Sequence, residues 1–74
     1  MAKHHIMDHT GHSTIEFDKA NKVDLDAAME RFKALTDNGH AAATRKAGAK
    51  DYTVVKAFDP NADETLFVSP MKGG

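Results

Sequence analysis

Residues 21–39, NKVDLDAAMERFKALTDNG, are the most strongly patterned part of this chain. Asp24 can cap a first helical turn, because its carboxylate accepts hydrogen bonds from the free backbone N–H groups there. Asn38-Gly39 supplies residues that commonly end a helix. The pattern therefore predicts a helix from Leu25 to Asp37. The residues that recur three and four positions apart and so share one helical face are Leu25, Ala28, Met29, Phe32, Leu35 and Thr36.

The remaining segments read as short strands separated by turn residues. Asp59–Asp63 contains Pro, Asn and Asp, which favour a turn and predict a hairpin between the last two strands. Gly11 allows a second hairpin near the N-terminus. The sequence therefore predicts an α+β fold, a single small domain with one amphipathic helix on a four- to five-stranded, mostly antiparallel sheet, in the order β(β)αβββ. The predicted strands are Lys3–Met7, Ser13–Phe17, His40–Arg45, Tyr52–Phe58 and Glu64–Val68.

Large apolar side chains occur on both faces of the predicted sheet. In the last two strands, Val55 and Phe67 point opposite to their apolar neighbours, because side chains alternate along a strand. A single helix covers only one face of a sheet. We therefore expect the second face, centred on Val55 and Phe67, to form an interface with a protein partner or a second copy of the chain.

The composition limits the classes of function that the chain can have. It has 74 residues, 41% hydrophobic and 28% charged, with a formal net charge of -1 and no cysteine. The charge balance argues against a dedicated nucleic-acid-binding protein, and the lack of cysteine excludes disulfides and thiolate metal sites. No apolar run is long enough for a membrane span, and no signal peptide is recognisable, so we expect a cytoplasmic protein. A core this small favours association with a partner.

Four histidines near the N-terminus are candidate metal ligands: His4, His5, His9 and His12. Imidazole binds zinc, nickel and copper, but the spacing lacks the general base of a His-Glu-x-x-His motif. The alternative is a polar, solvated or tag-like segment, and this is the interpretation we favour. In that interpretation residues 1–12 form an extended arm, which is the alternative to the predicted strand Lys3–Met7, and no metal or other cofactor is expected.

Catalytic motifs are not recognisable elsewhere in the chain. The carboxylates lie near predicted turns and helix ends, where they cap and solubilise, and no serine lies in a nucleophile motif. The basic segment Thr44-Arg45-Lys46, with Lys50 nearby, lacks the glycine-rich loop of a phosphate site. We therefore expect a protein that is not an enzyme.

The C-terminal tail, residues 70–74, ends in two glycines after a proline. Pro70, Gly73 and Gly74, together with the predicted strand order, resemble ubiquitin-like modifiers and the β-grasp sulfur carriers of cofactor biosynthesis. This resemblance implies activity through the C-terminal carboxylate of Gly74. The pattern is equally typical of a free chain end, or of a tail that fits where only glycine has room.

A second resemblance covers most of the chain. Met7-Asp8-His9-Thr10-Gly11, Asn38-Gly39, Phe58-Asp59-Pro60 and the end Phe67-Val68-x-Pro70-x-x-Gly73-Gly74 are similar to small proteins of bacteriophage and prophage genomes. The histidine-rich start departs from that pattern. The resemblance implies a virion or assembly component.

The sequence thus predicts an interaction module that acts without catalysis. It would bury one sheet face and its terminal arms against a protein partner or itself, and a phage head or tail accessory protein is one concrete form. The alternative is a ubiquitin-like modifier or sulfur carrier that acts through Gly74.

Overall fold

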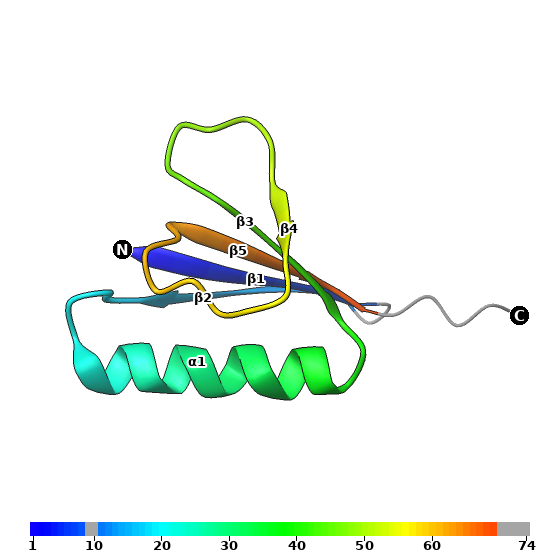
Figure 1. Cartoon of the computed structure of the whole chain (residues 1–74), viewed down its shortest axis with the longest axis horizontal. Helices are drawn as coiled ribbons and strands as arrows, with labels where there is room; N and C mark the ends of the chain where they lie inside the picture. Colours follow the sequence, from blue (N-terminus) through cyan, green and yellow to red (C-terminus); the bar gives the residue numbers. More distant parts are fainter. Residues whose placement is uncertain (9–10, 70–74) are drawn as a thin grey trace, which may run out of the picture.

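One helix packs across a five-stranded mixed sheet, in the chain order ββαβββ (Figure 1). The computed structural model describes residues 1–8 and 11–69. The elements are β1 (Ala2–Asp8), β2 (Gly11–Phe17), α1 (Lys22–Asp37), β3 (Ala41–Arg45), β4 (Thr53–Val55) and β5 (Glu64–Val68). The predicted fold class is confirmed. No helix within the described ranges is long and apolar enough to cross a membrane.

The strands lie side by side in the order β2-β1-β5-β3-β4. The two central strands, β1 and β5, run parallel, and every other neighbouring pair is antiparallel. Residues 2–8 therefore form a strand inside the sheet, so the predicted strand Lys3–Met7 is confirmed and the alternative of an extended arm is wrong for these residues. Residues 70–74, predicted as a tail, lie outside the described residues.

The predicted hairpin between the last two strands is also wrong. β4 is only three residues long and pairs with β3, whereas β5 lies between β1 and β3. The physical reason is burial: β5 contains Thr65 and Phe67, both almost fully buried, so it gains most from a central position with a neighbour on each side. β3 is a weak strand by propensity because it contains three alanines, and of these Ala42 faces the helix and is buried against Phe32 and Phe67.

The helix begins earlier than predicted and ends where predicted. Asn21 is the N-cap, and its side chain accepts a hydrogen bond from the backbone N–H of Asp24. Asp24 therefore lies within the first turn, where a negative charge favours the helix dipole. At the other end, the N–H of Gly39 donates to Thr36, and Gly39 has a φ of 93°, the left-handed conformation that glycine tolerates.

The core lies between α1 and one face of the sheet. Phe32 of the helix packs on Phe67 of β5, with ring centroids 5.6 Å apart. Phe58, in the loop after β4, contacts both groups of buried residues and joins them. Each buried phenylalanine stabilises the fold by roughly 1.5–3 kcal/mol. The buried apolar residues are Ala2, Phe17, Ala28, Phe32, Ala42, Ala62 and Phe67.

Candidate functional site: the open face of the sheet

The two residues predicted at the centre of an interface lie on the face that the helix covers. Phe67 is fully buried, and Val55 is half-buried against the same cluster, opposite Ala42 of β3. This placement corrects the prediction that Val55 and Phe67 form the uncovered surface. The alternation along the strands was predicted correctly, but the choice of covered face was wrong. It was wrong because the aromatic residue of β5, rather than its two aliphatic ones, packs on Phe32.

No helix of the described residues lies over the opposite side of the sheet (Figure 1). We call this side the open face and define it by the side chains that alternate with the buried ones. Three of its apolar residues are substantially exposed: Met7 at 45%, Val54 at 76% and Val68 at 43%. The pairing registers place its members on neighbouring strands: His12, Thr14 and Glu16; Lys3, His5 and Met7; Glu64, Leu66 and Val68; Ala41, Ala43 and Arg45; and Val54.

A row of polar side chains crosses one half of the open face. The ring of His5 lies between Thr14 and Glu64, with Nδ1 3.1 Å from the Thr14 hydroxyl and Nε2 2.8 Å from a Glu64 carboxylate oxygen. On its other side, Glu64 accepts a hydrogen bond from Arg45 Nε at 2.9 Å. The guanidinium of Arg45 stacks over Tyr52, with Arg45 Cζ 4.6 Å from the centre of the ring. These contacts link β2, β1, β5 and β3 and hold the side chains in fixed positions.

The charges in this row compensate one another. Hydrogen bonds from Arg45 and then from His5 lower the pKa of the Glu64 carboxyl, and the same bond to Glu64 raises the pKa of Arg45. Glu64 therefore remains a carboxylate with its oxygens occupied by neighbours. Such a carboxylate is suited to ordering a surface rather than to acting as a general base.

The apolar half of the open face lies beside this row. A shallow hollow of about 310 Å³ lies where the two halves meet. A hollow of this shape accommodates a side chain of a partner better than it encloses a small molecule. Its lining combines aliphatic, aromatic and charged groups: His5, Met7, His12, Arg45, Tyr52, Glu64 and Leu66.

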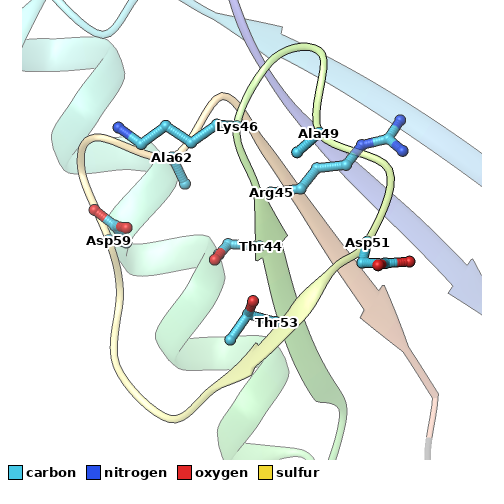
Figure 2. Close-up of a pocket in the computed structure, with 8 residues that line it drawn as sticks. All are labelled: Thr44, Arg45, Lys46, Ala49, Asp51, Thr53, Asp59 and Ala62. Carbon is cyan, nitrogen blue, oxygen red and sulfur yellow. The ribbon is translucent and has the colours of Figure 1, made fainter.

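A second hollow, of about 230 Å³, lies beyond the ends of β3 and β4. Figure 2 shows Thr44 and Thr53 between the two flanking loops, with Lys46 and Asp59 on one side. Asp59 is already engaged, because its carboxylate accepts from the backbone N–H of Asn61. Since this hollow combines opposite charges with hydroxyl groups and lacks a buried unpartnered group, it points to no particular ligand.

The sheet separates one candidate metal ligand, His4, from two others, His5 and His12. His4 is fully buried beneath the helix, whereas His5 and His12 lie on the open face with ring centroids 5.7 Å apart. His9 lies outside the described residues. Within residues 1–8 and 11–69, no three side chains of the ligand-forming types come together as a metal site.

His4 has a structural role that the sequence did not indicate. Its ring makes edge-to-face contacts with Phe17 at 4.8 Å and Phe67 at 5.0 Å, and Nδ1 lies 3.1 Å from Arg31 Nη1. Because arginine only donates, Nδ1 must accept, and the neutral ring then carries its proton on Nε2. Burial first, then the charges of Arg31 and His5, lower the pKa of His4 to about 4.

The residues predicted at the C-terminus, Pro70, Gly73 and Gly74, lie outside the described residues. Comparisons of the chain with protein-family models, with curated proteins and with solved structures found no match.

The sequence interpretation missed Arg45, Tyr52 and Glu64 as members of one surface. Arg45 was considered as the end of a strand and part of a basic segment, and Glu64 as the start of a strand and one of the carboxylates that cap or solubilise. The available signal was their alternation with buried residues: Glu64 lies two positions before Leu66, and Arg45 lies two positions after Ala43, on the same face.

Proposed function

We propose that this chain is a non-enzymatic interaction module that binds a protein partner through the open face of its sheet. The observation that carries the proposal is the exposure of Met7, Val54 and Val68 together on the open face, which no helix within residues 1–8 and 11–69 covers. Contiguous apolar surface on a small domain is typical of an interaction site. The covered face is excluded as the site, because Val55 and Phe67 serve the core.

The polar row supports a protein partner rather than a lipid surface. Glu64 and Arg45 satisfy each other and present a fixed pattern of donors and acceptors beside the apolar half. Protein interfaces commonly combine an apolar centre with a polar rim and an exposed aromatic or arginine side chain. Arg45 stacked on Tyr52 fits that description.

A phage particle is the concrete setting that we propose. In this proposal, the resemblance of the sequence to small bacteriophage proteins implies a partner in the virion head or tail. A single domain of 74 residues would act there as an accessory subunit, held by its open face. The proposal involves neither a nucleic acid nor a membrane.

A double variant with a matched control tests the open face. Val54→Glu combined with Val68→Glu places charges at its exposed apolar positions, whereas Val23→Glu places one on the helix at a side chain that is likewise 76% exposed. Each variant is expressed in the source organism, and the lysate is sedimented. We expect the wild type and Val23→Glu to travel with large particles and the double variant to stay at the top of the gradient, with its circular dichroism unchanged. Equal sedimentation of all three would contradict the proposal.

A second function is favoured by the topology. A ubiquitin-like modifier or sulfur carrier needs a small ββαβββ domain with a central last strand, and the order β2-β1-β5-β3-β4 supports that role. The active group would be the carboxylate of Gly74. Adding one residue after Gly74 would abolish this function and leave open-face binding intact. A ladder of heavier covalent species on a denaturing gel, lost in the extended variant, is the expected result.

A further inference from the structure

The outer edge of β2 is the longest edge of the sheet. β2 lies at the end of the strand order and has seven residues, whereas the opposite edge strand, β4, has three. Within the described residues, β2 pairs with β1 alone. His12, Ser13, Thr14 and Glu16 are exposed, and the segment contains neither proline nor lysine, the residues that commonly protect an edge from pairing.

The hydrogen bonds of β1 determine which backbone groups of β2 face outward. Lys3 N–H donates to Asp63 at 2.9 Å, and Met7 C=O accepts from Ser69 at 3.0 Å, so these residues of β1 direct their backbone groups at β5. The alternate residues of β1, such as His4, therefore bond to β2. Their partners in β2 are Gly11, Ser13, Ile15 and Phe17. The N–H and C=O groups of His12, Thr14 and Glu16 consequently point away from the sheet.

We propose that two copies of this chain pair through the outer edges of β2, antiparallel and with Thr14 opposite Thr14. The twofold axis then places His12 of each copy opposite Glu16 of the other. Each of these pairs exchanges two N–H···O=C bonds, and every outward backbone group of β2 obtains a partner.

The match between hydrogen-bond donors and acceptors favours this register and a second copy as the occupant. An imidazole opposite a carboxylate, twice by symmetry, with threonine opposite threonine between them, is a stabilising set of cross-strand pairs. Centring the pairing on Glu16 would instead oppose two carboxylates. Lys3 is already opposite Glu16 within each chain, so the carboxylate would lie between two potential donors. On the side of the sheet that the helix covers, pairing would also bury apolar surface, because half-buried Ile15 would lie opposite Ser13 of the second copy.

Pairing would produce one continuous ten-stranded sheet, twice the five strands of each copy, with both helices on the same side. The two open faces would adjoin across the axis without covering each other. The inference therefore goes beyond the proposed function: a chain that fails to dimerise can still bind a partner through its open face, and the reverse also holds.

Proline substitutions at the two edges provide a matched test. Thr14→Pro removes an outward N–H of β2 without removing a bond to β1. Val54→Pro removes an outward N–H of β4 at the opposite edge. It leaves the bonds to β3 in place, because those are made by Thr53 and Val55 on either side of Val54. Thr14→Val keeps the N–H and removes the hydroxyl that contacts His5. The purified proteins are compared by analytical ultracentrifugation over a concentration series, with circular dichroism to verify folding.

We expect the wild type, Val54→Pro and Thr14→Val to dimerise, and Thr14→Pro to raise the dissociation constant at least about tenfold. Wild type that stays monomeric throughout the series would overturn the proposal. Dimerisation that is equally weakened, or equally unaffected, by both prolines would overturn it as well.

Charge reversal tests the register without proline. Glu16→Lys opposes His12 with a cation, and His12→Glu opposes Glu16 with an anion, so each single variant is expected to weaken the dimer several-fold. The double variant places a carboxylate opposite an ammonium group across the axis and is expected to restore dimerisation. Failure of the double variant to recover would contradict the register centred on Thr14.

Discussion

Acidification should destabilise this protein through His4. The side chain is fully buried among aromatic rings, and its pKa is lowered from the ordinary value of 6.5 to about 4. The unfolded chain therefore takes up a proton at a higher pH than the folded chain does. The stability that this difference contributes is complete above pH 6.5 and is lost as the pH falls from there toward 4.

The size of the loss follows from these two pKa values. Between about pH 8 and pH 5, the linkage relation gives a decrease of ~2 kcal/mol in the free energy of unfolding from His4 alone. The physical reason is local: a protonated His4 can no longer accept from Arg31 and would place two cations 3.1 Å apart beneath the helix.

Denaturant unfolding at both pH values measures the effect. His4→Phe removes the titration and keeps an aromatic ring in the cluster, and half-buried Arg31 can turn to water. We expect this variant to lose about 2 kcal/mol less than the wild type on acidification. Lys22→Ala, at an exposed position of the helix, is the control and should lose as much free energy as the wild type. If His4→Phe and the wild type lose the same free energy, His4 is not the group that titrates, and the reasoning is refuted.

Two further substitutions test the packing and the helix cap. Phe32→Ala removes the helix side chain that packs on Phe67 and should lower the free energy of unfolding by about 3–5 kcal/mol, measured by denaturant titration; a loss below about 1 kcal/mol would contradict the core described here. Asn21→Ala removes the side chain that accepts from Asp24 N–H and should cost about 1 kcal/mol, whereas Lys22→Ala, one residue later and exposed, should be nearly neutral.

The parts of the fold that depend on local pattern could be predicted from the sequence. The helix ends at Asp37 because Asn38-Gly39 follows it, and the strand Glu64–Val68 has the predicted bounds. The helix start was wrong because Asn21 and Asp24 are both good capping residues and lie three positions apart. The structure uses the first as the cap and the second inside the turn.

The parts that depend on long-range pairing could not be predicted. A strong turn sequence, Asp59–Asp63, suggested a hairpin, but the choice of neighbours for β5 is made by contacts with β1, more than fifty positions earlier in the chain. The same choice determines that Phe67 faces inward and Leu66 outward. His4 shows the same limitation, since its burial follows from the central position of β1 and not from its neighbours in sequence.

Two methionines allow the central claim, binding through the open face, to be measured in the wild-type protein. Met7 lies on the open face and is 45% exposed, and Met29 lies on the helix and is 48% exposed. Peroxide oxidises exposed methionines, so the two should react at similar rates in the free chain. In the particle-bound chain, we predict that Met7 is protected and Met29 is not, as read by mass spectrometry. Oxidation of Met7 at the rate of Met29 in the bound form would contradict the account.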